Sequence, residues 1–428
     1  MKQFASVLKS LEEKIKLLFA KTFENKSKFN IIVDIACIVF FFLAVLSIPL
    51  CSFRAGLNKV TWIFTIGFLG CMCLGLLLYY QIRFDVVSIS LVIFNIWMLL
   101  STAINGFKGF TITPITMSLT TLILYLYLSQ NRKLIPFIIM AIYLSIVLFA
   151  FSYIAIYFKE LISLDFKRLG SYFGDINDVS IFFGAGFSIT FAALLLTKFK
   201  IWRFLIEAAM LLIFGICGLS TGSKMFLLII AATSIIAIVL FLRKLKVKWF
   251  VYLLSFGGLL GVAVLILNLP AFATIKLRLL EFTTDASTIE RFTMFVDGFY
   301  MFLRKPLFGF GIHGFFISSS FGEGWSHNNF SELLSSYGLV GFMLFYTPYI
   351  VSLKRIKKTQ KSTLKSIINT ILVLFICCMF VVALESQKIF AYTIPCVYAF
   401  YASEKYFDLN VRDIFKKKEN RQIEGANS

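Results

Sequence analysis

The sequence predicts an all-α integral membrane protein, from its composition, the length of its apolar runs and the charges between them. Of its 428 residues, 59% are hydrophobic and 17% aromatic, and the mean hydropathy is +0.87. One soluble core could not bury that much apolar surface. Runs of about 20 apolar residues are long enough to cross a bilayer as helices. Twelve spans are predicted, near 31–50, 60–80, 84–104, 110–129, 134–157, 178–197, 201–218, 222–242, 247–269, 329–353, 364–384 and 387–404.

Lys and Arg residues gather in alternate connections between these spans, which predicts the orientation of the chain. With the N-terminus in the cytoplasm, 29 of the 42 Lys and Arg residues lie on the cytoplasmic side, as the positive-inside rule requires. The net charge of +20 therefore needs no nucleic-acid partner. We expect a cytoplasmic-membrane protein with both termini inside. Its segments are a cytoplasmic amphipathic stretch (1–30), spans one to nine (31–269), an extracytoplasmic loop (270–328), spans ten to twelve (329–406) and a basic cytoplasmic tail (407–428).

The N-terminal stretch and the cysteines suggest neither processing nor cross-linking. The first 30 residues are Lys-rich, and the apolar run after them is long enough to span, so no cleaved signal peptide is predicted. Seven of the eight cysteines lie within apolar runs, and Cys51 lies at the end of one. Their spacing fits neither a disulfide framework nor a zinc site, so we interpret them as small hydrophobic residues.

The loop at 270–328 is predicted to contain an amphipathic helix. Ser287 and Glu290 have the spacing of a capping box, so a helix should begin there, and Pro306 should end it. Long segments outside the membrane in a compact bundle are usually functional. We expect the apolar face to lie on the bundle or on the membrane interface. That face comprises Phe292, Phe295, Val296, Phe299, Phe302 and Leu303.

A glycine-rich pattern, Gly309-Phe-Gly311-Ile-His-Gly314, follows this helix. It has the spacing of a dinucleotide-binding motif, but that motif follows a strand, and no dinucleotide is expected on the outer side. We therefore predict a tight, closely packed turn.

Charged residues are nearly absent from the middle of the spans. Asp34, Asp85 and the pair Arg203–Glu207 lie near cytoplasmic ends, and the best midplane candidate, Asn95, is uncharged. Ion-coupled transporters usually keep an ionisable group near the midplane. The sequence therefore does not favour an ion-coupled transporter.

At the outer boundary, by contrast, Arg168, Lys224 and Arg291 gather with both histidines. Guanidinium and ammonium groups can hold and neutralise phosphate oxygens at a partly dry interface. The alternative is that these cations only anchor helix ends or bind ordinary lipid phosphate. The outer carboxylates have no spacing that dictates a divalent metal site, so no metal is predicted.

His327 is the best candidate for a catalytic base. Asn329 and Glu332 have the spacing of a helix start, so His327 should lie just before a helix N-terminus, whose partial positive charge disfavours imidazolium. A general base must be neutral imidazole. The alternative is an interfacial histidine that binds a loop carbonyl. His313, within the glycine turn, is interpreted as structural.

Four stretches resemble the O-antigen polymerase and ligase family, which includes the Wzy-type polymerases of capsule and O-polysaccharide. Arg168 to Asn177 is similar to that family's Arg-x-x-Gly…Asn before a span, and Leu219-Ser-Thr-Gly-Ser-Lys224 to its Thr-x-Ser-Arg. Thr288 to Gly311 is similar to its Arg…Asn/Lys-Pro-Leu-x-Gly-x-Gly. The fourth stretch is His327-Asn328…Glu332…Gly338…Gly341. One departure is Lys224 where Arg is usual, which keeps the charge but loses the planar fork.

The resemblance implies a GT-C-like membrane glycosyltransferase without a cofactor, acting on undecaprenyl-diphosphate-linked oligosaccharides at the outer face in capsule, exopolysaccharide or O-antigen synthesis. In that reading His327 deprotonates the acceptor, and Arg168, Lys224 and Arg291 hold the donor diphosphate. Asn177, Asn328 and Glu332 support the site, and the loop helix excludes water. A flippase and a chain-length regulator of the same pathway are possible partners, beside membrane lipid.

Two alternatives stay open beside the polymerase. A ligase would share these motifs and differ in its acceptor, lipid A core. A transporter or flippase for lipid-linked sugars would also be rich in spans and outward cations. The single long loop argues against transport, because transporters are commonly built from repeats.

Overall fold

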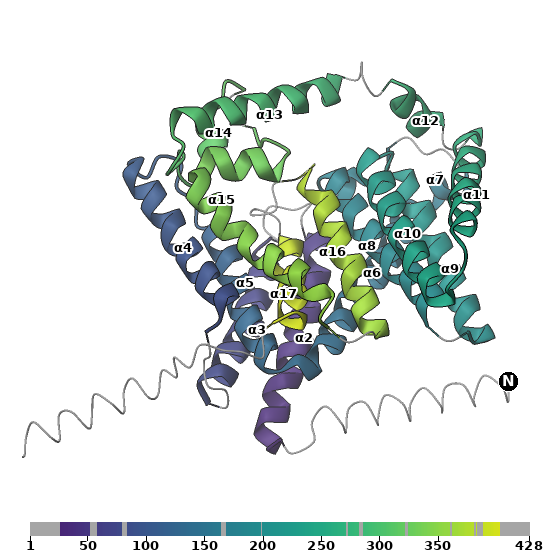
Figure 1. The fold of residues 1–428 in the computed structure, drawn as a ribbon, viewed down its shortest axis with the longest axis horizontal. Helices are drawn as coiled ribbons and strands as arrows, with labels where there is room; N and C mark the ends of the chain where they lie inside the picture. Colours follow the sequence, from purple (N-terminus) through teal and green to yellow (C-terminus); the bar gives the residue numbers. More distant parts are fainter. Residues whose placement is uncertain are drawn as a thin grey trace, which may run out of the picture.

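The computed structural model is a helical bundle (Figure 1) and describes residues 26–51, 58–78, 84–163, 168–197, 199–270, 273–281, 286–321, 324–359, 362–380, 382 and 388–402. Within these residues no strand is formed, so the predicted all-α class is confirmed. The helices are α2 (Lys28–Cys51), α3 (Asn58–Leu78), α4 (Val86–Ile104), α5 (Thr113–Gln130), η1 (Arg132–Leu134), α6 (Ile135–Ile156), α7 (Phe158–Ile162), η2 (Ser171–Phe173), α8 (Ile176–Leu196), α9 (Ile201–Ser220), α10 (Lys224–Leu245), α11 (Trp249–Leu267), α12 (Ala273–Leu280), α13 (Ala286–Arg304), α14 (Gly314–Ser318), α15 (Asn329–Ile356), α16 (Thr363–Met379) and α17 (Lys388–Phe400).

Eight helices of the described part are long and apolar enough to cross a membrane, which makes this a membrane protein. They are α2, α3, α4, α6 with the preceding η1, α8, α9, α10 and α15. Each of the twelve predicted spans overlaps a helix, and α16 and α17 are shorter apolar helices. Crossing by α5, α11, α16 and α17 stays a prediction, as do the orientation and the GT-C-like arrangement. Most of the N-terminal segment and the C-terminal tail lie outside the described residues.

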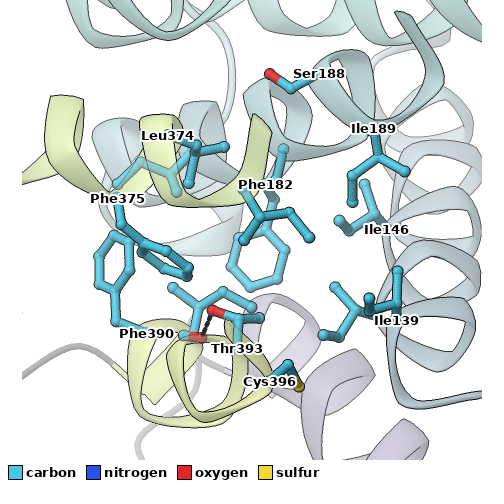
Figure 2. A pocket seen from close by; sticks show the side chains of 15 residues that line it. Ile139, Ile146, Phe182, Ser188, Ile189, Leu374, Phe375, Phe390, Thr393 and Cys396 are labelled. Carbon is cyan, nitrogen blue, oxygen red and sulfur yellow. Dashed lines mark hydrogen bonds between the residues drawn. The ribbon is translucent and has the colours of Figure 1, made fainter. Parts of the chain in front are cut away.

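Close packing of rings and small residues holds the bundle together, since lipid chains compete with apolar side chains for burial. Phe41 of α2, Phe68 of α3 and Tyr392 of α17 meet with centroids 5.4 to 6.0 Å apart. A small apolar cavity lies between α6, α8, α16 and α17 (Figure 2). The hydroxyl of Thr393 on its wall donates to the Ile389 carbonyl at 2.7 Å, so this polar group is satisfied within its own helix.

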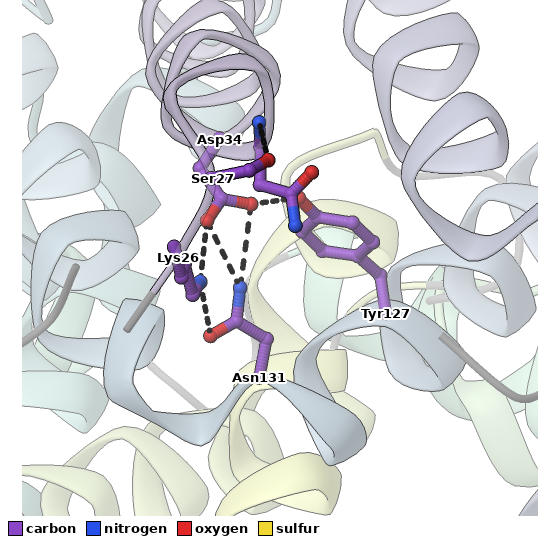
Figure 3. A network of polar contacts seen from close by, with 6 residues as sticks. Lys26, Ser27, Asp34, Tyr127 and Asn131 are labelled. Atoms are coloured by element: carbon purple, nitrogen blue, oxygen red, sulfur yellow. Dashed lines mark hydrogen bonds and ion pairs between the residues drawn. The ribbon is translucent and has the colours of Figure 1, made fainter. Parts of the chain in front are cut away.

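The buried carboxylate of Asp34, in the first turns of α2, is held by hydrogen bonds from three side chains. Asp34, which is 2% exposed, accepts hydrogen bonds from Lys26 Nζ at 2.5 Å, from Asn131 Nδ2 at 3.3 and 3.4 Å, and from the Tyr127 hydroxyl (Figure 3). A buried carboxylate is tolerated only with such partners. The network joins α2 to the α5–α6 connection and has a structural role.

Helix α15 is broken at Gly338, and the glycine-rich loop 306–314 donates hydrogen bonds to the backbone carbonyls beside the break. Gly338 has φ 64° and ψ −167°. The Ser335 carbonyl accepts the amide of Phe310 at 2.9 Å, and the Ser336 carbonyl accepts that of Gly311 at 2.7 Å. Within a membrane, backbone groups freed by a broken helix must find protein partners. The loop supplies them.

Helix α4 also contacts both α15 at the break and the loop 306–314. Trp97 Nε1 donates to the Tyr337 carbonyl at 2.9 Å, and its ring stacks on Phe308 of the loop at 4.8 Å. The Ser101 hydroxyl donates to the Phe308 carbonyl. The loop is therefore held between two helices, and its position is fixed by hydrogen bonds on both sides.

The loop can approach this closely because it contains glycine. A β carbon on Gly309 would lie 2.5 Å from the Ser336 carbonyl group, and one on Gly311 would lie 2.9 Å from Thr102 Cα. Both glycines have positive φ. The predicted tight turn is confirmed, and no dinucleotide-binding motif is formed.

Helix α13 lies across the upper end of the bundle in Figure 1. It begins at Ala286, so Ser287 lies in its first turn and not at its N-cap, and it ends at Arg304, two residues before Pro306. The predicted ring face does not pack on the bundle, so its contact with the membrane interface stays a prediction. Met294, Gly298 and Met301 face the bundle, because the small Gly298 lets Ser331 of α15 approach. The predicted ring face, Phe292, Phe295, Phe299 and Leu303, is 39 to 67% exposed.

The break in α15 gives a stability prediction. Gly338→Ala should lower the thermal stability of the purified protein, because a β carbon would lie 2.3 Å from the Leu307 carbonyl oxygen. The backbone conformation is also one that only glycine adopts readily, with a cost of order 1–3 kcal/mol. The measurement is the melting temperature in detergent.

Gly258→Ala in α11 is the matched control, since a β carbon there meets no atom within 4 Å. We expect its melting temperature to be unchanged or slightly raised, because alanine favours a helix over glycine. Equal melting temperatures for both variants would show that the break needs no glycine.

Candidate functional site

Arg168 lies against the turn between α9 and α10. The amide of Leu169 donates to the Ser220 carbonyl at 2.9 Å, which joins the loop before α8 to this turn. The exposed Arg168 side chain packs beside Gly222, where a β carbon would lie 3.7 Å from Arg168 Cγ. Lys224 lies two residues after Gly222 and begins α10, so Arg168 lies beside the turn that leads into Lys224.

The N-termini of α8 and α10 lie side by side. Asp175 caps α8 by accepting the Asn177 amide at 2.6 Å, and Ser223 caps α10 by accepting the Met225 amide at 3.3 Å. The Ser223 hydroxyl donates to Asn177 Oδ1 at 3.0 Å. Asn177 therefore joins the two helix starts, and its supporting role in the site stays a prediction. Two adjacent helix N-termini present partial positive charge to the same space.

Lys224 connects α10 to the loop helix α13. Its Nζ donates to the Thr288 hydroxyl at 3.0 Å, and the side chain is half-buried. Thr288 lies one turn before Arg291 on α13. The first turn of α13 therefore lies over the N-terminus of α10, and the third predicted cation, also half-buried, belongs to the same region.

His327 lies close to residues of both α13 and α8. Burial lowers the pKa of its imidazole, and the positive charge of Arg291 lowers it further, while Asp175 and Glu290 act in the opposite direction. The ring is therefore predominantly neutral at neutral pH. A neutral imidazole was predicted from the helix N-terminus, but burial is the first cause.

The helix start after His327 differs from the prediction by one residue. The N-cap is Asn328, whose Oδ1 accepts the amides of Phe330 at 2.9 Å and Ser331 at 3.2 Å. Asn329 is buried instead, and its Nδ2 donates to the Tyr346 hydroxyl at 2.8 Å. The predicted cap at Asn329 is therefore wrong, because its neighbour reaches the free amides.

His313 belongs to a separate cluster. Its Nε2 lies 3.1 Å from the Thr111 hydroxyl, and its ring meets Trp325 edge-on at 4.7 Å. Burial lowers its pKa. These contacts join two loops and agree with the structural role that was predicted.

Three further residues of this region were not singled out from the sequence: Ser223, Thr288 and Ser326. Ser223 had a usable signal, because a serine directly before an apolar helix is a favoured N-cap. Thr288 acts through a contact with the distant Lys224, and Ser326 through contacts within the turn at His327, and spacing along the chain reveals neither. Within the described ranges, no three His, Cys, Asp or Glu side chains form a possible metal site; independence from metal stays a prediction.

Comparison with protein families identifies the central part of the chain. Residues 208–346 match the family model described as O-antigen ligase. The match covers the stretches with Lys224, Arg291 and His327, while Arg168 and Asn177 precede it. Among curated proteins no match to the chain is found. The predicted resemblance to the O-antigen polymerase and ligase family is therefore confirmed over residues 208–346, which are similar to the O-antigen ligase family model.

Proposed function

We propose that the protein is a polysaccharide polymerase, a membrane glycosyltransferase that joins undecaprenyl-diphosphate-linked oligosaccharide repeat units. The observation that carries this proposal is the position of a neutral histidine beside a cation. Arg291 is close enough to His327 to lower the pKa of its ring, and Lys224 contacts α13 one turn away. A base and positive charges at one end of a membrane bundle suit a reaction that deprotonates a hydroxyl and releases a diphosphate.

In the proposed reaction, His327 accepts the proton of an acceptor sugar hydroxyl on a new repeat unit. The hydroxyl oxygen attacks the anomeric carbon of the donor sugar on the growing chain, and a glycosidic bond forms. The bond from that carbon to the diphosphate oxygen breaks, and undecaprenyl diphosphate leaves with the bonding electrons. The proton is then lost from His327 to water.

The leaving group gains negative charge as that bond breaks, and the proposed role of Arg168, Lys224 and Arg291 is to stabilise it. Cations act most strongly where water is partly excluded, and Lys224 and Arg291 are half-buried. The paired N-termini of α8 and α10 add partial positive charge. The first turn of α13 contacts the N-terminus of α10 through Thr288 and Lys224, and there α13 would limit hydrolysis of the donor.

The proposed site faces the outside of the cytoplasmic membrane, in capsule, exopolysaccharide or O-antigen synthesis. Of the 42 Lys and Arg residues, 29 lie in the connections predicted on the cytoplasmic side, opposite the proposed site. The positive-inside rule therefore supports this orientation. The proposed partners are the lipid-linked substrate, membrane lipid, and the flippase and chain-length regulator of the same pathway.

An O-antigen ligase is the second candidate, because the matching family model carries that description. A ligase would use the same base and cations and differ in its acceptor, lipid A core. The two functions differ in the product that accumulates when the protein is lost.

His327→Ala should abolish polymer while the protein stays in the membrane, because alanine has no group that could accept the proton assigned to His327. The measurement is polysaccharide length on a gel, from deletion cells complemented with wild type or the variant.

A single lipid-linked repeat unit should accumulate in both the deletion and the variant. Full-length polymer left unattached would mean a ligase, and repeat units trapped inside the cell would mean a transporter. Normal chain length in the variant would remove His327 from catalysis.

Lys224→Arg should keep polymer synthesis near the wild-type rate, because the charge is retained, while Lys224→Ala should lower it by about 10- to 100-fold, the range for one charged hydrogen bond. The measurement is the rate of polymer formation in membranes with equal amounts of protein.

Lys276→Ala is the control, since Lys276 is another half-buried cation, in α12, whose Nζ donates to Asn268 Oδ1 at 2.7 Å. Its rate should not change. Equal rates for Lys224→Arg, Lys224→Ala and wild type would end the assignment of Lys224 to the diphosphate.

A further inference from the structure

We propose that Glu332 is a positioning residue that acts on His327 through Ser326, holding the backbone turn that aims the imidazole. This inference rests on the function proposed for His327 and adds a residue whose side chain need not touch the substrate. It replaces the capping role that the spacing of Asn329 and Glu332 predicted.

The Glu332 carboxyl group is fully buried, with 0% of the residue exposed. One oxygen, Oε2, accepts the amide of Ser326 at 3.1 Å. Ser326 is also 0% exposed. A buried amide needs a partner, and here the partner comes from a helix side chain six residues along the chain, across the His327 turn.

Ser326 in turn hydrogen-bonds to Asn328, the residue on the other side of His327. Its hydroxyl donates to the Asn328 carbonyl at 2.8 Å and accepts the Asn328 amide at 3.3 Å. The residues on both sides of His327 are therefore tied to each other. His327 itself has φ +50°, in the left-handed region that non-glycine residues rarely adopt. Such a conformation persists where the surroundings determine it.

The second carboxyl oxygen connects the turn to the break in α15. Ser336 Oγ donates to Glu332 Oε1 at 3.4 Å, and the Ser336 carbonyl accepts the amide of Gly311 at 2.7 Å. Glu332 therefore lies between the His327 turn and the loop that completes the broken helix. A single side chain therefore connects the turn that carries the base to the hydrogen-bonded break in α15.

The experiment uses the full-length protein in detergent with isotope-labelled histidine and follows the ring signals by NMR as a function of pH. The chain has two histidines, and His313→Gln assigns the signals. The charged groups that act on His327, namely Arg291 and Glu290 of α13 and Asp175 before α8, are kept in every variant. Turnover of lipid-linked repeat units is measured on the same samples.

Glu332→Leu should raise the pKa of His327 toward its ordinary value, because a released turn exposes the ring to water. It should lower kcat by about 100-fold, the scale of a 1 Å misplacement, with little change in KM. Glu332→Gln should keep the wild-type titration and most of the turnover, since its amide oxygen can still accept the Ser326 amide. Ser326→Ala should shift the titration in the same direction as Glu332→Leu, by a smaller amount.

Tyr346→Phe is the control for a general loss of order in α15, because it removes the partner of Asn329 without touching Ser326. It should leave the His327 titration unchanged. An unchanged titration in both Glu332→Leu and Ser326→Ala would overturn the proposal, as would a Glu332→Gln variant that behaves like Glu332→Leu. If the titrations shift as expected while the wild-type protein never joins repeat units, the positioning role stands and the proposed function fails.

Discussion

The break in α15 is the constraint that determines how the loop 306–314 and helix α13 pack at this end of the bundle. A helix that stops inside a membrane leaves carbonyl groups without partners, and hydrocarbon supplies none. Here the amides of Phe310 and Gly311 fill that need, which forces the loop 306–314 into close contact with α15. The loop ends α13 and starts α14, so its position also sets where α13 crosses the bundle (Figure 1). Thr288 and Arg291 belong to α13, so the backbone hydrogen bonds that fix the loop also help to place these two residues.

The electrostatics of the site balance two demands. A diphosphate needs positive charge, but the same charge beside a histidine disfavours imidazolium. Arg291 and burial therefore keep His327 neutral and ready to accept a proton, while Asp175 and Glu290 limit how far its pKa falls. In the proposed reaction, the carboxylates would also stabilise the imidazolium that forms when His327 takes the proton. One group of charges can thus serve the base and the leaving group together.

Much of the fold could be predicted, because hydropathy and helix stop signals are local properties. Each predicted span overlaps a helix, and Pro306 follows the end of α13. What failed depended on neighbours distant in sequence. The sequence did not reveal that Gly298 and two methionines of α13 face the bundle, because their partners Ser331 and Phe315 lie elsewhere in the chain. At the site, the cations and His327 were recognisable from motifs, whereas the Glu332–Ser326 contact depends on the conformation of the turn at His327, which spacing does not give.

The most direct measurement uses the purified protein in lipid vesicles, supplied with lipid-diphosphate-linked repeat units and no other protein. We expect oligomers of the repeat unit to form, with one free lipid diphosphate released for every glycosidic bond. Wild-type protein that moves the repeat units across the bilayer without joining them would contradict the proposal that this site performs glycosyl transfer. Joining without release of lipid diphosphate would contradict the role given to the cations.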